Sequence, residues 1–227
     1  MEILAEIPFV LDPLALMKPL RIEPGSGDES DLLALIDVAR QVGKPKAVYT
    51  ESFVEGRDGD TVDIGGITFT SRTLNRNLAT AERVFPMIAT CGVEMDAAFP
   101  ACGDMVQEFW WDLIKTHLLG AAHKYLDEAL HRKFRLGKTA TMRPGSGDAS
   151  IWPIDQQRGL FALLGGVEAA IGVRLTDSFL MVPNKTTSGI LFPTEVDFRS
   201  CEVCHRETCP SRHAPFNKEL WDAMQHD

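Results

Sequence analysis

One apolar pattern constrains the possible folds of this chain more than any other, and it runs from Asp104 to Lys133. Apolar side chains recur there at every third or fourth position, which is the spacing of one face of an α-helix. The residues on this face are Val106, Phe109, Trp110, Leu113, Ile114, Leu118, Ala121, Ala122, Tyr125, Leu126, Ala129 and Leu130. At about 1.5 Å per residue the helix spans roughly 45 Å. The pattern therefore predicts the main structural helix, one that crosses most of the molecule.

Shorter strand and helix patterns surround this segment without a regular alternation. β-branched and aromatic runs predict strands at Lys46–Val54, Thr61–Ile64, Ile67–Thr70, Arg83–Thr90, Lys138–Met142, Val173–Thr176, Ser178–Val182 and Ile190–Phe192. Helical spacing predicts short helices over 31–42, 72–78 and 154–164. Pro86, inside one predicted strand, indicates an edge position or a bulge. The irregular order favours an α+β fold with a largely antiparallel sheet over a doubly wound fold.

Composition narrows the class of protein. Apolar residues make up 44% of the 227 positions and charged residues 24%, as in ordinary globular domains. The net charge of −9 argues against a binder of nucleic acid or of anionic membranes, which presents a basic face. Apolar runs reach only about ten residues, too short to span a bilayer. The acidic N-terminal stretch lacks the features of a signal peptide, so we expect a cytoplasmic protein.

Two glycine-containing loops are candidates for holding a small charged ligand. The first covers 143–148 and reads RPGSGD, and the second covers 183–189 and reads PNKTTSG. Glycine lets backbone amides turn outward and lets a ligand approach closely, and arginine offers a planar fork to a carboxylate or phosphate. Ordinary turns use the same residue types, so that interpretation stays open. A shared site requires Gly145 and Gly189 to lie on the same side of the molecule.

The polar segment 199–227 is rich in cysteine, and we predict that it forms a tail appended to a domain of residues 1–198. Three of the five cysteines, Cys201, Cys204 and Cys209, lie within nine positions. Such clustering suggests a metal site more than a disulfide framework. Zinc and an iron–sulfur cluster both suit thiolates, and His205, His213, Cys102, Cys91 or an outside ligand would complete the set. A metal-free reduced tail or an adventitious disulfide is the alternative.

Five motifs in order resemble the activation domain of cobalamin-dependent methionine synthase, in the form that carries a C-terminal cysteine motif. They are Pro144-Gly145-Ser146, the segment from Trp152-Pro153 to Gln157, Ile171 to Thr176, Met181 to Phe192, and the cysteine run that follows. The motifs cover about the last 90 residues well. The resemblance implies a C-shaped α+β domain with a bent antiparallel sheet.

The resemblance also implies a function. Domains of this family bind S-adenosylmethionine in a shallow groove and present its methyl group to a reduced corrinoid on another domain. The implied binding residues are Arg143, Pro144, Gly145, Ser146 and Gly147 in the first loop. In the second loop they are Lys185, Thr187, Ser188 and Gly189. Arg143 would pair with the ligand carboxylate, the glycine amides would bond to the ligand, and the second loop would form the far wall.

The chain departs from the family at two points. Ser146 stands where many relatives have tyrosine, and Ala121-Ala122-His123-Lys124 lacks the acid that the methionine synthase domain carries on its long helix. Asp148 or Asp155 would have to substitute for that acid. We therefore expect an accessory protein that supports S-adenosylmethionine-dependent remethylation of a corrinoid carried by a partner methyltransferase or methionine synthase, without catalysis of its own. The alternative is a partner-binding or metal-binding module that has lost the ligand.

Overall fold

The computed structural model describes all residues except 100–103, 149, 207, 210, 211, 226 and 227. Within the described residues, an eight-stranded antiparallel sheet forms the centre of the molecule. Its strands are β1 (Glu2–Leu4), β2 (Lys46–Tyr49), β3 (Ser52–Asp58), β4 (Thr61–Ile64), β5 (Ile67–Thr70), β6 (Arg83–Thr90), β7 (Thr139–Met142) and β10 (Thr186–Pro193). A separate short ladder joins β8 (Arg174–Leu175) to β9 (Met181–Val182).

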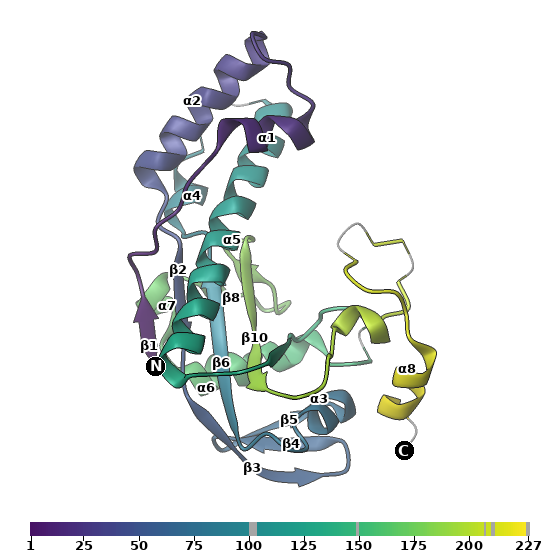
Figure 1. Cartoon of the computed structure of the whole chain (residues 1–227). Helices are drawn as coiled ribbons and strands as arrows, with labels where there is room; N and C mark the ends of the chain where they lie inside the picture. Colours follow the sequence, from purple (N-terminus) through teal and green to yellow (C-terminus); the bar gives the residue numbers. More distant parts are fainter. Residues whose placement is uncertain (100–103, 149, 207, 210–211, 226–227) are drawn as a thin grey trace.

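Strand β6 is the centre of the sheet. It pairs with β2 and β3 on one side and with β10 on the other, and β10 in turn pairs with β7. The sheet is bent, because β3, β4 and β5 turn away from the direction of the upper strands (Figure 1). The predicted strands Thr61–Ile64, Ile67–Thr70 and Arg83–Thr90 have these bounds in the structure.

The expected edge position or bulge at Pro86 is wrong. Pro86 is buried in the central strand, and the register on both sides of it is regular. A proline is tolerated there because of its neighbour across the ladder. The Pro86 carbonyl accepts a hydrogen bond from the amide of Thr50, and Thr50 and Glu51 separate β2 from β3. The amide hydrogen that proline lacks would therefore face the gap between β2 and β3, where the ladder of strand hydrogen bonds is interrupted.

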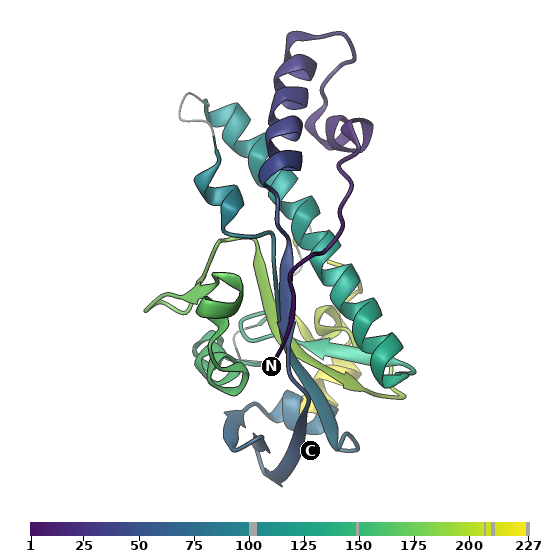
Figure 2. The same ribbon diagram turned by 90° about the vertical axis from the view of Figure 1, so that its left-hand side faces the viewer.

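The predicted long helix is confirmed as α5 (Met105–Phe134), capped by Asp104. The remaining helical segments are α1 (Pro13–Leu20), α2 (Gly27–Val42), α3 (Arg72–Asn77), α4 (Glu94–Ala97), α6 (Gln157–Leu164), α7 (Val167–Ile171), α8 (Lys218–Gln225) and the 3-10 helices η1 (Ile154–Gln156) and η2 (Ser200–Val203). The second half of α5 covers one face of the sheet, and its first half packs with α1 and α2 above the sheet (Figures 1 and 2). Helices α6 and α7 pack on the opposite face.

The segment after Phe198 packs against the same core as the strands. Val203 of η2 is buried in the cluster that contains Phe69, Trp152 and Phe192. Leu220, Trp221 and Met224 of α8 pack on this cluster from outside. A division of the chain after residue 198 stays a prediction, and the described part of the tail is in contact with the main core.

The observed architecture confirms an α+β fold with a mostly antiparallel sheet and one long helix. Among the described residues, no helix combines the length and the apolar character that a bilayer crossing requires.

The packing of α5 on the sheet leads to a stability prediction. Leu126 is 1% exposed and lies among Ala47, Phe85 and Leu191. Leu126→Ala should lower the free energy of unfolding by about 2–5 kcal/mol, because it leaves a cavity in a close-packed interface. Urea unfolding monitored by circular dichroism measures this, with exposed Lys124→Ala as the matched control on the same helix. Equal unfolding midpoints for the two variants would contradict the assigned packing.

Candidate functional site

Arg143 follows directly after β7 and reaches across the sheet edge toward α5. Its Nε donates a hydrogen bond to Oγ1 of Thr187 at 3.1 Å, and its Nη2 donates to Nε2 of His123 at 2.7 Å. Thr187 lies on β10 and His123 on α5. Three elements therefore fix the orientation of one guanidinium group.

The surroundings of Arg143 are unusual for a half-buried cation. Burial lowers the pKa of Arg143, and among the described residues no carboxylate forms an ion pair with it. Burial, together with the nearby positive charge of Arg143, also lowers the pKa of His123, although Asp127 acts in the opposite direction. A neutral His123 accepts the arginine hydrogen bond through Nε2. The site thus holds a desolvated positive charge whose observed partners are neutral.

Arg143 lines a groove of about 570 Å³ between α5, β7 and the segment after β10. Charges of both signs surround it, with Lys138 paired to Asp197 at 2.7 Å. The groove is lined by Asp127, Lys138, Thr139, Ala140, Thr141, Arg143, Ser146, Val196, Asp197, Phe198, Arg199, Ser200, Cys201 and His213. A mixed polar surface of this kind suits a ligand with separated charges more than an apolar one.

The two predicted loops approach each other at Arg143. A Cβ added to Gly189 would lie 2.6 Å from the Met142 carbonyl oxygen and 3.0 Å from Cγ of Arg143. Glycine is therefore required at this position of β10, because the backbone carbonyl of β7 leaves no room for a side chain. Pro144 is buried, and Gly145 has a φ of 74° with its Cα against Ile154. Ser146 lines the groove beside Arg143.

Two neighbouring residues of the second loop, Thr187 and Ser188, lie on opposite faces of β10. Thr187 faces α5 together with Leu191, because alternate residues of a strand share a face. Ser188 lies on the other face, where it donates a hydrogen bond to Oε1 of Gln157 at 2.8 Å. The structure brings Thr187 and Gly189 to Arg143, and it does not bring Ser188 there.

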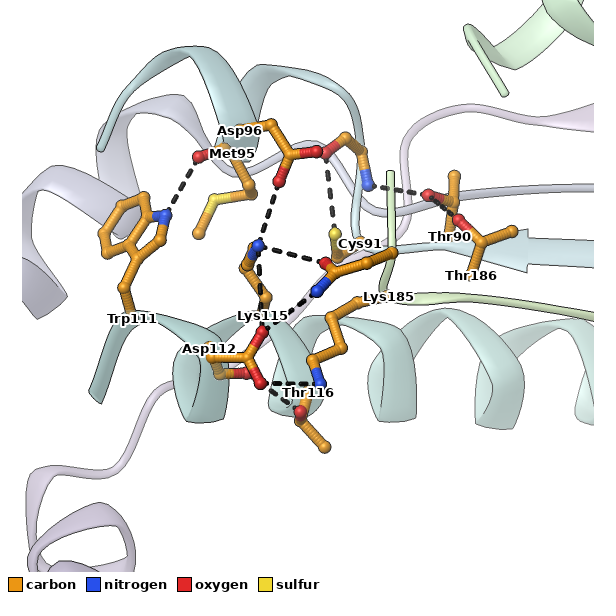
Figure 3. A network of polar contacts seen from close by, with 12 residues as sticks. Thr90, Cys91, Met95, Asp96, Trp111, Asp112, Lys115, Thr116, Lys185 and Thr186 are labelled. Atoms are coloured by element: carbon orange, nitrogen blue, oxygen red, sulfur yellow. Dashed lines mark hydrogen bonds and ion pairs between the residues drawn. The ribbon is translucent and has the colours of Figure 1, made fainter. Parts of the chain in front are cut away.

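Lys185 also lies apart from Arg143, within a charged network near the start of α5 (Figure 3). Its Nζ lies 2.7 Å from Oδ2 of Asp112. Lys115, almost buried, donates to Asp96 at 2.9 Å and to Asn184 at 3.1 Å. Burial is the largest single influence on the pKa of Asp112 and raises it, but the hydrogen bonds from Lys185 and Asn184 and the charges of Lys185 and Lys115 together lower it, so the net shift is downward. This network ties the second loop to α4 and α5.

The three tail cysteines line one smaller cavity of about 150 Å³, next to the groove. Ser146, Ser200 and Cys201 line both spaces. Among the described residues, no group of three or more His, Cys, Asp or Glu side chains is arranged to hold a metal ion. The predicted metal site on Cys201, Cys204 and Cys209 therefore stays a prediction.

The candidates for a fourth ligand are dispersed. Cys91 is buried in the apolar cluster under α2, and burial raises its pKa to about 12. The His205 ring packs against Phe216 and Trp221, and its Nδ1 lies 3.4 Å from Asp148. His213 lines the groove, and Cys102 lies outside the described residues. None of the described candidates lines the cysteine cavity.

Sequence reasoning missed two acids that line the groove, Asp127 and Asp197, of which Asp197 pairs with Lys138. Asp127 lines the groove together with Arg143 and lies one helical turn after His123. The i, i+4 spacing from His123 was the available signal. The suggested substitutes, Asp148 and Asp155, do not line the groove, since Asp148 bonds to Ser150 and His205, and Asp155 is exposed in η1.

Residues 101–207 match the family model described as vitamin B12 dependent methionine synthase, activation domain. This chain resembles that activation-domain family. A solved structure described as the MetH reactivation domain bound to AdoHcy matches with a TM-score of 0.56 and 19% sequence identity. The match covers 81% of this chain and 71% of that one. No curated protein matches the chain.

The structural match confirms the activation-domain fold, including the arrangement of the long helix on the antiparallel sheet. At 19% identity it carries no ligand assignment to this chain. The match to the family model runs from just before α5 through the first loop to residue 207, so it includes His123, Arg143, Cys201 and Cys204 but not Cys209.

The lowered pKa of His123 leads to a prediction about pH. The unfolded imidazole takes up a proton below about pH 6.5, and the folded site resists it, so stability should fall as pH decreases through this range. His123→Gln keeps an acceptor for Arg143 and should flatten the decrease in unfolding free energy between about pH 7 and pH 5. Urea unfolding at several pH values measures it, and exposed His117→Gln is the control. A slope unchanged by His123→Gln would contradict this assignment.

Proposed function

We propose that the groove beside Arg143 binds S-adenosylmethionine. We further propose that the chain thereby supports reductive remethylation of a corrinoid carried by a partner protein. The observation that carries this proposal is the half-buried, desolvated Arg143 guanidinium, whose observed hydrogen-bond partners are neutral. A desolvated cation facing a groove favours an anionic ligand group. The activation-domain match supports the choice of this ligand over other carboxylates.

The charges of the groove fit the methionine end of the ligand. The α-carboxylate pairs with Arg143, and the ammonium lies toward Asp127, the acid on α5. Backbone amides of Gly145–Gly147 and the Ser146 hydroxyl are donors for the rest of the ligand. Thr187 and Gly189 serve by positioning Arg143. Lys185 and Ser188 are not part of this site, because their side chains are engaged elsewhere.

The chemistry assigns the chain an accessory role. The sulfonium of S-adenosylmethionine is the methyl donor, and the acceptor is the cobalt of a corrinoid on the partner after one-electron reduction. S-adenosylhomocysteine is then the product, and the solved MetH reactivation domain is described as bound to that molecule. The partner is a corrinoid protein or a corrinoid-dependent methyltransferase such as methionine synthase.

We infer in addition that Cys201, Cys204 and Cys209 hold a metal group, zinc or an iron–sulfur cluster, beside this groove. The described cysteines are free thiols, which suits the reducing conditions of the cytoplasm. We therefore expect the chain to act there.

The alternative function is a partner-binding module that keeps the fold without the ligand. It is favoured by Lys185 and Ser188, which turn away from Arg143. Isothermal titration of the whole chain with S-adenosylmethionine distinguishes the two. If millimolar S-adenosylmethionine produced neither heat nor a shift in melting temperature, ligand binding would be excluded and the partner-binding module would be the supported function.

Substitution of Arg143 tests the ligand site directly. Arg143→Gln should weaken S-adenosylmethionine binding by about ten- to hundred-fold, because a hydrogen bond to a charged group contributes about 1.5–3 kcal/mol. The measurement is the dissociation constant from calorimetry. Arg132→Gln, an exposed arginine on the last turn of α5, is the matched control. If Arg143→Gln and Arg132→Gln bind with the affinity of the wild type, the ligand carboxylate does not meet Arg143.

A further inference from the structure

The cavity lined by the three tail cysteines has a restricted set of side chains. Cys201, Cys204 and Cys209 are its thiols, and its other lining residues are Ser146, Gly147, Ser200, Arg206 and Arg212. No imidazole or carboxylate appears in this described lining. The cavity is about 150 Å³, which in another protein is room enough for a molecule the size of benzene. It therefore has space for a group of several atoms in contact with all three sulfurs.

Arg212 fixes the backbone that carries these thiols. Its guanidinium donates hydrogen bonds to four main-chain carbonyls, those of Cys201 at 2.9 Å, Cys204 at 2.8 Å, Arg206 at 2.6 Å and Ala214 at 2.9 Å. Its Nε is buried and has no hydrogen-bond partner among the described residues. One side chain thus pre-organises two of the cysteines, and it leaves one desolvated donor beside the cavity.

The cavity adjoins the groove through the first loop. Gly147 has a φ of 85°, and a Cβ added there would lie 3.4 Å from Cβ and 3.6 Å from Sγ of Cys204. The first loop therefore lies beside Cys204, and the positive φ of Gly147, not a lack of space, favours glycine there. Because Ser146 and Cys201 line both spaces, a group bound by the thiols lies next to a ligand in the groove.

We propose that Cys201, Cys204 and Cys209 ligate a four-iron iron–sulfur cluster in this cavity, with the fourth iron left to an outside ligand. Structural zinc sites are closed by four protein ligands around one ion, whereas the cavity offers three thiols around a larger space. Each cysteine of a four-iron cluster binds a different iron, so the sulfurs surround a group of atoms and do not converge on one point. Thiolates are the usual ligands of such clusters.

The charges around the cavity suit an anionic cluster. Arg206 and Arg212 are its charged lining residues. The backbone amide of His213 donates a hydrogen bond to Sγ of Cys201 at 3.5 Å. Hydrogen bonds to cluster sulfurs and nearby positive charge raise the reduction potential, so these groups set the potential of the cluster.

The role of the cluster, unlike its presence, rests on the proposed function. The reduced cluster passes one electron to the cobalt of the partner's corrinoid and returns to its oxidised state. A low-potential one-electron donor of the ferredoxin or flavodoxin class then reduces the cluster again. The reduced cobalt takes the methyl group from S-adenosylmethionine in the adjoining groove.

Anaerobic reconstitution of the whole chain tests the site. Purified protein is incubated with ferrous iron, sulfide and equimolar zinc, and iron, acid-labile sulfide and zinc are then counted. We expect about four irons and about four sulfides per chain, broad visible absorption, and a paramagnetic signal after reduction with dithionite. Stoichiometric zinc in place of iron, or no bound metal, would overturn the proposal.

Variants locate the cluster. Most of the iron should be lost from each of the single variants Cys201→Ser, Cys204→Ser and Cys209→Ser. The control Cys91→Ala should keep its iron, because Cys91 belongs to the apolar core packed against α2 and does not line the cavity. Arg212→Lys keeps every ligand and removes the carbonyl contacts, so its iron content should also fall. Circular dichroism checks that each variant is folded, and the wild-type metal count does not depend on any variant. Iron retained in the triple cysteine variant would also overturn the proposal.

The two proposals fail separately. If the protein holds the cluster but gives no heat with S-adenosylmethionine, the proposed function is contradicted and the iron–sulfur site is still supported. If the protein binds S-adenosylmethionine but takes up no iron, only the proposed iron–sulfur site is contradicted.

Discussion

The packing of α5 against the central strands is the contact on which the rest of the molecule depends. Ala122, Leu126 and Leu130 lie on Ala47, Phe85 and Leu191 of the sheet, and burial of this apolar surface fixes the height and rotation of the helix. The same rotation sets His123 against Arg143 and places Asp127 in the groove. A polar site is therefore held in place by an apolar interface one helical turn away.

The resulting groove joins parts of the chain with different chemistry. Arg143 from the end of β7 supplies a desolvated positive charge, and the tail supplies three thiols next to it. Arg212 holds the tail loop together through main-chain carbonyls, which allows a segment with few apolar residues to keep one shape. The groove proposed to bind S-adenosylmethionine and the cavity proposed to hold the cluster therefore lie side by side.

Much of the fold could be predicted from local patterns. The long helix and the strands at Thr61–Ile64, Ile67–Thr70 and Arg83–Thr90 follow from side-chain spacing and turn chemistry. Pro86 was misjudged because its tolerance depends on a break in another strand, at Thr50 and Glu51. The candidate site was predicted in part, since Arg143, Ser146 and Gly189 gather at one place but Lys185 and Ser188 do not.

The sequence by itself determined the kinds of element, the loops rich in glycine, the clustered thiols and the resemblance to the activation-domain family. These depend on interactions within a few residues of one another, or on motifs that can be read in order. The tertiary structure decided which side of β10 meets Arg143, that Asp127 of α5 lines the groove, and that the cysteines share a cavity with Gly147. Those outcomes depend on strand register and on the rotation of α5, which long-range packing sets and no local pattern contains.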